Sequence, residues 1–226
     1  MSTTNMLKLK SGRKFCYLTN EGIENELITK GLSNKLNIPT DLETGVYEGG
    51  LKIWECSIDL CNFIDSISFE GFNVLELGCG AGLPSIVAAL NGATSLTLQD
   101  FNDYVLETCT KRNFQLNGID LEKCFFIASD WNNCEELKNS KKFDIILTSE
   151  TIYNENNYIP LLNLMNELLA INGEIYLAAK SYYFGVGGSI DSFKKLIQSK
   201  GIFNCQEVWK TTKSSVERRI LKMTRI

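Results

Sequence analysis

The 226-residue sequence contains no histidine. This absence excludes catalysis by a Ser-His-Asp triad or a Cys-His pair, and it removes a principal ligand of zinc and iron, so we expect no metal site. No apolar run approaches the roughly 18 residues of a membrane-spanning helix, and residues 1–15 lack the apolar core of a secretory signal. We therefore expect no contact with a membrane and no secretion.

The eight cysteines form no C-x-x-C pair, and most of them lie within apolar segments. This distribution is typical of buried, reduced thiols in an intracellular protein, so we expect a cytoplasmic or nuclear location. The length and the 44% hydrophobic content suit one globular domain, with no internal repeat or low-complexity tract.

The net charge of −4 is distributed unevenly along the chain. Residues 1–40 carry +3, residues 41–193 carry −14 and residues 194–226 carry +7. An acidic central portion favours the approach of a basic partner, but a solvated surface without a partner explains the same pattern. No basic stripe with interleaved aromatic residues is present, so we expect no direct nucleic-acid partner.

From residue 51 onward, helical patterns alternate with short apolar strands. We expect helices at 51–61, 84–91, 103–116, 158–169 and 190–199, and strands at 72–77, 95–99, 124–128, 143–148, 174–179, 203–210 and 216–224. The last two strands are separated only by a polar turn, which indicates an antiparallel hairpin. The pattern predicts an α/β fold: a Rossmann-like, mostly parallel seven-strand sheet with a C-terminal antiparallel hairpin and helices on both faces.

Residues 1–45 form a more polar segment. We expect them to be an N-terminal extension, packed on or near a catalytic domain of residues 46–226. The extension contains one strand-like piece at 14–19 and a mixed segment that ends near Pro39. Within the domain, Asn102 is a candidate N-cap for the helix at 103–116.

The most informative motif is VLELGCGAGLP at residues 74–84, where an apolar strand runs directly into Gly78, Gly80 and Gly82. Glycines allow a sharp turn and the close approach of a ligand to the backbone. A dinucleotide loop reads G-x-G-x-x-G, but here Leu83 stands at the third glycine position, and Pro84 suits the first turn of a helix. The loop resembles the S-adenosylmethionine loop of seven-strand methyltransferases.

Polar and aromatic side chains follow the next strands. They are Gln99, Asp100 and Phe101 after the second strand, Ser129, Asp130 and Trp131 after the third, and Ser149 and Glu150 after the fourth. Because ligands of open α/β sheets bind outside the carboxyl ends of the strands, these residues predict one site. Asp100 suits both hydroxyls of a ribose, while Asp130 and Trp131 suit an adenine amine and its ring face. A surface Asp that caps a helix and a core Trp are the alternatives.

The chain also resembles a particular family. The segments YEGGLKIWECS (47–57), VLELGCGAGLP, QDF (99–101), TSETIYN (148–154) and KSYYFGVGG (180–188) are similar to the protein-histidine methyltransferases, whose best-known member modifies a large-subunit ribosomal protein. The resemblance covers about residues 47–188. It implies the cofactor S-adenosylmethionine, with contacts at Ile53, Trp54, Glu55, Cys56, Ser57, Gly78, Gln99, Asp100, Phe101, Ser129, Asp130, Trp131 and Ser149, to which the loop itself adds Gly80 and Gly82. Periodicity alone would place Trp54 and Glu55 in the core.

This resemblance implies transfer of a methyl group to a histidine of a protein substrate. An imidazole, with a pKa near 6.5, is already mostly neutral at pH 7, so it needs only an acceptor for its other ring nitrogen. Glu150 and Tyr153 are the candidates, with an ordinary loop contact as the alternative. Tyr182, Tyr183 and Phe184 are candidates for the wall of a substrate entrance, although the glycines that follow equally suit a plain turn.

Three other functions remain open from the sequence. A lysine methyltransferase of the same fold would have to deprotonate its substrate first, at about 4–5 kcal/mol at pH 7. A catalytically silent scaffold would bind the cofactor and transfer nothing. A dehydrogenase is disfavoured because Leu83 replaces the third glycine of its loop.

Overall fold

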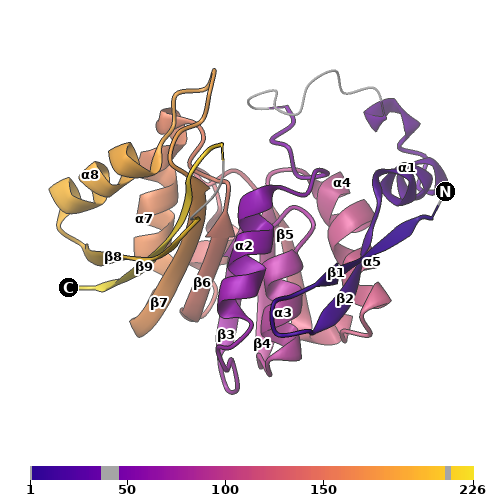
Figure 1. Cartoon of the computed structure of the whole chain (residues 1–226), viewed down its shortest axis with the longest axis horizontal. Coiled ribbons are helices and arrows are strands. Elements are labelled where there is room, and N and C mark those ends of the chain that lie inside the picture. Colours follow the sequence, from indigo (N-terminus) through magenta and orange to yellow (C-terminus); the bar gives the residue numbers. More distant parts are fainter. Residues whose placement is uncertain (1, 37–45, 212–214) are drawn as a thin grey trace.

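The computed structural model describes residues 2–36, 46–211 and 215–226. Its main element is a seven-stranded sheet with the order β5-β4-β3-β6-β7-β9-β8 (Figure 1). The strands are β3 (Asn73–Leu77), β4 (Ser95–Asp100), β5 (Cys124–Ala128), β6 (Phe143–Ser149), β7 (Leu169–Lys180), β8 (Phe203–Lys210) and β9 (Arg218–Arg225). Strands β3 to β7 pair in parallel, and β9 pairs antiparallel with both β7 and β8. The predicted fold class, including the C-terminal hairpin, is confirmed.

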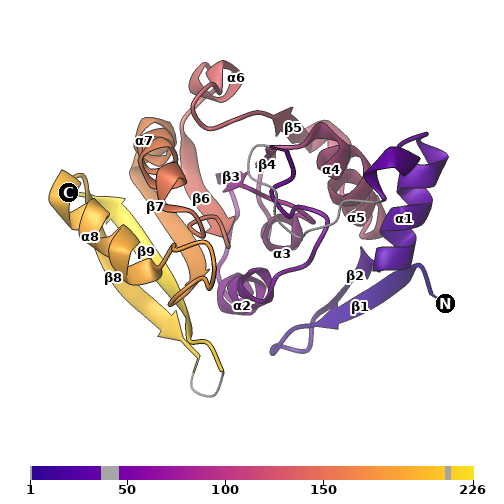
Figure 2. The same ribbon diagram turned by 90° about the horizontal axis from the view of Figure 1, so that it is seen from above.

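Helices cover both faces of this sheet (Figure 2). One face carries α2 (Glu55–Ile64), α3 (Leu83–Leu90) and a continuous helical segment made of α4 (Asp103–Val105), a π-helical turn (Leu106–Thr110) and α5 (Lys111–Leu116). The other face carries α6 (Glu135–Lys138), α7 (Tyr158–Leu168) and α8 (Ile190–Lys200). Each face has its own apolar core, because successive strand residues point to opposite sides: Val74 of β3 packs in the first core, and Leu75 and Leu77 pack in the second.

The N-terminal residues form a separate antiparallel sheet of β1 (Thr4–Lys8) and β2 (Lys14–Leu18), followed by α1 (Asn20–Thr29). The strand expected at 14–19 is confirmed, whereas β1 and α1 were not predicted. β1 is largely exposed and has no clear alternation, and α1 buries only Gly22, Ile23 and Leu27, so neither leaves a strong pattern. Pro39 and the boundary at residue 45 lie outside the described residues. The division into two parts therefore stays a prediction.

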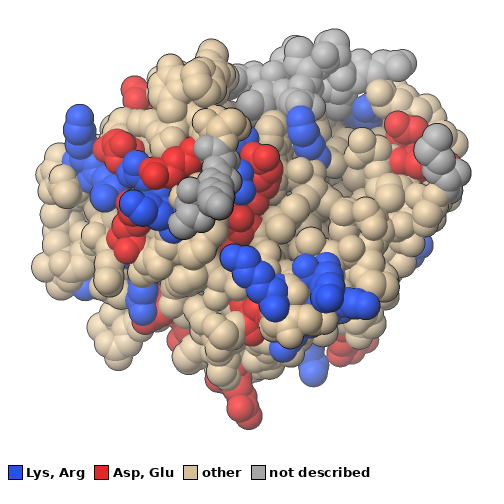
Figure 3. All heavy atoms as spheres, viewed as in Figure 1, with Lys and Arg blue, Asp and Glu red and all other residues tan. Residues whose placement is uncertain are grey.

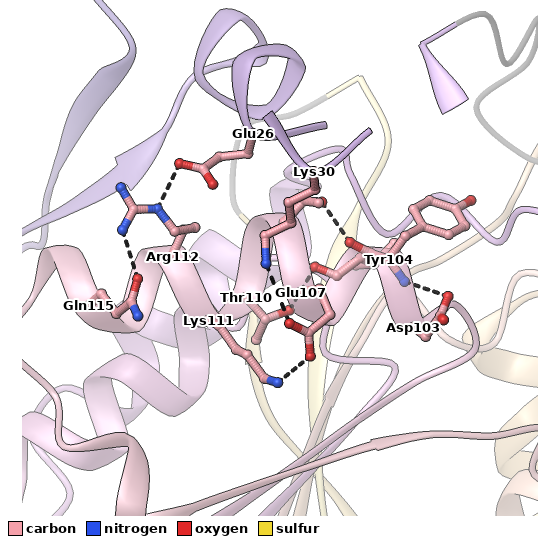
Figure 4. Close-up of polar contacts among 11 residues, drawn as sticks. Glu26, Lys30, Asp103, Tyr104, Glu107, Thr110, Lys111, Arg112 and Gln115 are labelled. Carbon is pink, nitrogen blue, oxygen red and sulfur yellow. Dashed lines mark hydrogen bonds and ion pairs between the residues drawn. The ribbon is translucent and has the colours of Figure 1, made fainter. Parts of the chain in front are cut away.

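This N-terminal unit contacts the helical segment 103–116. The Leu18 N–H donates to Asn113 Oδ1 at 2.8 Å, and Asn117 exchanges two hydrogen bonds with the Cys16 backbone. Ion pairs add to these contacts, with Arg112 Nε 2.7 Å from Glu26 and Lys30 Nζ 3.5 Å from Glu107 (Figure 4). Apolar side chains of the unit, among them Phe15, Leu18 and Leu27, also join the core on this face of the sheet.

Three expected boundaries differ from the structure. The helix expected at 51–61 begins only at Glu55, because Trp54 is extended and its Nε1 donates to the Gly49 carbonyl. Asn102 occupies the N-cap position but makes no capping hydrogen bond: its Oδ1 has no partner among the described residues, while its amide donates to the Val46 carbonyl. The fourth helix ends at Leu168, and β7 begins directly after it, five residues earlier than the strand expected from 174.

The basic C-terminal segment is neutralised within the molecule. Arg218 lies 2.5 Å from Asp59 of α2, and Arg219 lies 2.9 Å from Asp191 of α8. Figure 3 shows basic and acidic side chains intermixed over this side of the molecule, on the left of the view. Internal ion pairing therefore accounts for part of the charge asymmetry along the chain.

All eight cysteines are free, and six of them are buried, which agrees with the expected reduced thiols. Within the described ranges, no helix is long and apolar enough to cross a membrane. No group of three or more potential metal ligands occurs among the same residues.

Glu76 of β3 has a buried carboxyl group that contacts the first turn of α3. Its Oε2 accepts hydrogen bonds from the Ser85 backbone N–H at 3.0 Å and the Ser85 hydroxyl at 2.5 Å. Burial nevertheless raises the pKa of Glu76 to about 8, because desolvation of the charged form outweighs these two hydrogen bonds. The side chain is therefore mostly protonated at neutral pH.

The substitution Glu76→Gln tests this protonation. The parent binds one more proton when folded than when unfolded between about pH 5 and pH 8, so its stability falls as pH rises through that window. Relative to Glu76→Gln, the unfolding free energy of the parent should fall by about 1.4 kcal/mol per pH unit and level off above pH 8. Denaturant unfolding at several pH values measures the difference, with the exposed Glu136→Gln as control. A pH-independent difference would contradict a protonated Glu76.

Candidate active site

A pocket opens at the carboxyl ends of β3, β4, β5 and β6, under the segment 46–54. Figure 1 shows that segment in purple at the upper edge of the sheet, where α2 begins. The lining includes Ile53, Trp54, Ser57, Gly78, Gly80, Gly82, Gln99, Asp100, Phe101, Ser129, Asp130, Trp131 and Ser149, together with Glu150 and Tyr153. The fold thus brings together the predicted cofactor and catalytic residues, except for Glu55 and Cys56.

Those two residues lie just outside the lining because the helix α2 starts at Glu55 and turns them away. Glu55 is exposed and pairs with Lys180 and Arg218 at 3.7 and 3.6 Å. Cys56 is fully buried, with its backbone N–H 3.4 Å from Glu150 Oε1 and its thiol also in hydrogen-bond contact with the Glu150 carboxylate.

The glycine loop has the conformation that its sequence indicated. Gly78, Gly80 and Gly82 have φ angles of 61°, 48° and 71°, which side chains disfavour. A Cβ atom on Gly78 would lie 2.6 Å from the Thr151 side chain, and one on Gly82 would lie 3.0 Å from Phe114. The first glycine therefore allows the loop to approach β6, and the third allows α3 to pack on α5.

Two consecutive side chains of β4 hold this loop. The Gly78 N–H donates to Gln99 Oε1 at 3.2 Å, and the Gly80 N–H donates to Asp100 Oδ2 at 2.8 Å. From behind, the buried Thr110 hydroxyl donates to the Gly80 carbonyl at 2.6 Å. The Asn113 amide donates to Ala81 at 2.9 Å, so the same Asn113 links the loop to the N-terminal unit.

Asp100 is 4% exposed and faces the pocket. Burial raises its pKa to about 6, although backbone N–H groups of Gly80, Asn102 and Phe101 partly oppose the shift. At neutral pH it is a buried carboxylate whose two oxygens each accept a backbone hydrogen bond and retain a further lone pair. This is the environment that a pair of ligand hydroxyls requires.

Gln99 also fixes the far wall of the pocket. Its Oε1 accepts from the Trp131 indole N–H at 2.8 Å, and its amide donates to the Ser129 carbonyl at 2.7 Å. One side chain therefore orients both the glycine loop and the indole. Asp130 follows at the lining, where its Oδ1 accepts from the Asn132 N–H at 2.8 Å.

Glu150 has the most unusual backbone of the site. Among the described residues, it is the only non-glycine residue with a positive φ, at 59°. Its side chain is 6% exposed, Oε1 lies 3.7 Å from Lys180 Nζ, and Oε2 has no hydrogen-bond partner among the residues that the structure describes. A strained backbone and an unpaired buried carboxylate oxygen are both unfavourable for folding, and such features concentrate at functional sites.

Tyr153 is anchored by a residue that the sequence reasoning missed. Its hydroxyl donates to Glu48, and burial together with this contact raises the pKa of Tyr153 well above its usual range. Tyr183 packs edge-on against the Tyr153 ring, 6.4 Å away, and burial followed by the Glu150 charge raises its pKa too. Both phenols are therefore neutral hydrogen-bonding groups at neutral pH.

The expected substrate entrance is only partly supported. Tyr183 is buried behind the pocket lining, whereas Tyr182 and Phe184 are 44% and 78% exposed and stack edge-on on each other. Gly188 is needed for close packing, since a Cβ there would lie 2.1 Å from the Ile152 carbonyl oxygen. The entrance role of these aromatic residues stays a prediction.

Lining residues that the sequence did not single out include Glu48, Gly49, Gly50, Lys52 and Thr151. The adjacent glycines were the available signal. Gly50 approaches Gly80 so closely that a Cβ on Gly80 would lie 3.0 Å from the Gly50 carbonyl oxygen.

The fold places the chain in one class of enzyme folds, that of the S-adenosylmethionine-dependent methyltransferases. A ribosomal protein L11 methylase from Lactobacillus delbrueckii superposes with a TM-score of 0.59 at 19% identity, covering 79% of this chain and 83% of that chain. SMU.776, a protein proposed to be a methyltransferase and solved as a complex with SAH, gives a TM-score of 0.63 at 16% identity and covers 98% of this chain and 56% of its own.

The family follows from the sequence. Residues 32–187 match the profile of the family described as lysine methyltransferase, and the chain belongs to that family. Curated relatives named histidine protein methyltransferase 1 homolog occur in Dictyostelium discoideum, at 48% identity over 73% of this chain and 53% of that protein, and in Bos taurus, at 35% identity over 85% and 60%. The predicted resemblance to protein-histidine methyltransferases is confirmed. The chain spans 53% to 61% of the length of the first four curated relatives it matches.

The strained backbone at Glu150 leads to a stability prediction. Glycine tolerates a positive φ, and Glu150→Gly also removes the unpaired buried carboxylate oxygen. These gains exceed the entropy lost with glycine and the Lys180 contact, so the variant should unfold with a free energy about 1 kcal/mol higher than the parent. Chemical denaturation measures it, with Glu136→Gly as a helical control that should be destabilised. A Glu150→Gly variant less stable than the parent would show that the conformation carries little strain.

Proposed function

We propose that this protein is an S-adenosylmethionine-dependent protein methyltransferase whose acceptor is a histidine imidazole of another protein. The observation that carries the proposal is Glu150, which lines a nucleoside-type pocket and whose buried Oε2 has no hydrogen-bond partner among the described residues. The named relatives support histidine as the acceptor residue.

The residues of the pocket fit the cofactor. The glycine loop leaves its backbone open where a Cβ atom would intrude, and Asp100 offers carboxylate lone pairs suited to ribose hydroxyls. Asp130 and the held Trp131 indole suit the amine and the face of an adenine. The backbone of the glycine loop and the Trp54 side chain would contact the methionine portion of the cofactor. S-adenosylmethionine bound in this pocket would supply an electrophilic methyl group and leave as the neutral thioether.

The protein contributes to the reaction mainly by orienting the acceptor imidazole. The Glu150 carboxylate accepts the N–H of one imidazole nitrogen, which directs the lone pair of the other nitrogen along the pocket. Forming the N–C bond leaves a positive charge on the ring, and this charge is removed when the N–H held by Glu150 releases its proton to solvent. Tyr153, held neutral by Glu48, adds a second polar contact. No residue has to remove a proton before attack, because the imidazole is mostly neutral at pH 7.

A lysine acceptor is the second candidate, since the family profile is described by that residue. A lysine must lose its proton before it attacks, and this step needs about 4–5 kcal/mol at pH 7. The Glu150 carboxylate on the lining already has the Lys180 ammonium 3.7 Å from its Oε1, so it is poorly placed to deprotonate a second ammonium group. A carboxylate that is already paired with an ammonium group favours an imidazole acceptor over a lysine acceptor.

We further propose that the substrate is a large-subunit ribosomal protein, encountered in the cytoplasm or nucleus. The family resemblance supports this choice, and the free cysteines suit a reducing compartment.

Incubation with methyl-labelled S-adenosylmethionine and an extract rich in ribosomal proteins tests the reaction. After acid hydrolysis, the label should be recovered as methylhistidine. Because this chain contains no histidine, labelled methylhistidine must come from another protein. Recovery as methyllysine would assign the enzyme to the other acceptor, and cofactor binding without any label would favour a scaffold.

The ribose contact has its own test in S-adenosylhomocysteine binding by calorimetry. Asp100→Ala should weaken binding by tenfold or more, because the hydroxyls lose their acceptor and the Gly80 N–H loses its partner. Parent affinity should also fall below about pH 6, where Asp100 becomes protonated. Equal affinities, or a parent affinity that does not change between pH 7 and pH 5, would reject the assignment. Asp103→Ala, on the same connection but outside the lining, is the matched control.

A further inference from the structure

Lys180, the last residue of β7, lies directly behind the proposed imidazole acceptor. Its Nζ is 3.7 Å from Glu150 Oε1 and 5.4 Å from the centre of the Trp54 ring. The side chain is 20% exposed, and a second contact of 3.7 Å joins it to the exposed Glu55. Lys180 does not itself belong to the pocket lining, so its effect on a ligand acts through Glu150 and Trp54.

The two carboxylate oxygens of Glu150 have different surroundings. The Cys56 N–H of α2 and the Lys180 ammonium of β7 lie at Oε1. The Cys56 thiol and the Tyr183 side chain, from the loop after β7, also hydrogen-bond with the carboxylate. Arg218 of β9 reaches this cluster through Glu55, at 3.6 Å. The Oε2 oxygen has no partner among the described residues. Lys180 is therefore a cation in direct contact with the Glu150 carboxylate, at Oε1.

We propose that Lys180 is a specificity-determining positioning residue, which neutralises Glu150 so that the site accepts a neutral imidazole and rejects a lysine ammonium. The inference rests on the proposed function, since it concerns the acceptor of that same reaction. A lone buried carboxylate would attract any cation that entered the pocket. With Lys180 held against it, the pair keeps a hydrogen-bond acceptor but offers little net charge to an incoming ammonium.

The same pair controls the protonation of the acceptor. At a separation of about 7 Å and an effective dielectric constant near 40, one positive charge disfavours the imidazolium form of an imidazole by roughly one pH unit. Removing Lys180 leaves Glu150 uncompensated, which favours the imidazolium. The imidazole that attacks must be neutral, so Lys180 extends activity towards lower pH.

The test compares Lys180→Met with Lys180→Arg. Methionine retains the aliphatic stem against Trp54 but not the charge, whereas arginine retains the charge. Lys222→Met is the matched control, because Lys222 pairs with Glu174 at the other end of β7, at 2.6 Å. Circular dichroism and melting establish that each variant is folded. The readouts are kcat against pH on the histidine substrate, and binding of the same substrate with lysine in place of the histidine.

In Lys180→Met, the midpoint of the rising pH limb should move up by about one unit, and the lysine-containing substrate should bind about tenfold more tightly. Lys180→Arg and Lys222→Met should match the parent in both readouts. A lower kcat in Lys180→Met with an unmoved midpoint and unchanged lysine binding would overturn the proposal, because it would indicate a merely structural role. If the parent methylates no histidine at all, the proposed function fails first, and the two failures are thereby distinguished.

Discussion

The pocket depends on the hydrogen bonds that join the glycine loop to two neighbouring side chains of β4. Gln99 and Asp100 accept the N–H groups of Gly78 and Gly80, so the loop cannot move without breaking contacts to the adjacent strand. Gln99 also holds Trp131, and Asp100 is the acceptor proposed for the ribose. The parallel arrangement of β3 and β4 makes this possible, because their carboxyl ends meet at one edge of the sheet.

Several groups around this edge are held in states that oppose folding. Glu150 adopts a left-handed backbone conformation, Asp100 is buried with a raised pKa, and Glu76 is protonated beneath the loop. The two apolar cores on either face of the sheet supply the compensating stability. The arrangement suits a reaction that needs an oriented acceptor more than a strong base, since orientation is what a rigid, partly strained site provides.

Much of this architecture could be predicted from the sequence, because its strongest patterns are local. Strands such as β6 are apolar on both faces, which indicates a buried parallel sheet. The glycines at 78, 80 and 82 indicate a tight loop with positive φ angles. The N-terminal unit was missed because β1 is largely exposed and α1 buries few residues, so the apolar side chains that it adds to the core form no clear period.

At the site, the residues at strand ends were predicted, since topology alone brings those positions together. The side chains that contact these residues were not predicted. Glu48 meets Tyr153 across 105 residues of chain, and Lys180 meets Glu150 only because β6 and β7 are neighbours. The start of α2 at Glu55 was misplaced because Trp54 continues an apolar spacing while its backbone remains extended.

A crystal structure with S-adenosylhomocysteine is the most direct test of the central claim, that this pocket presents a methyl group to an acceptor held by Glu150. The account predicts the ribose hydroxyls at Asp100, the adenine between Asp130 and Trp131, and the sulfur at the end of the pocket nearest the Glu150 carboxylate. A ligand in the reverse orientation, or one whose own amine or hydroxyl occupies the Glu150 carboxylate, would contradict it.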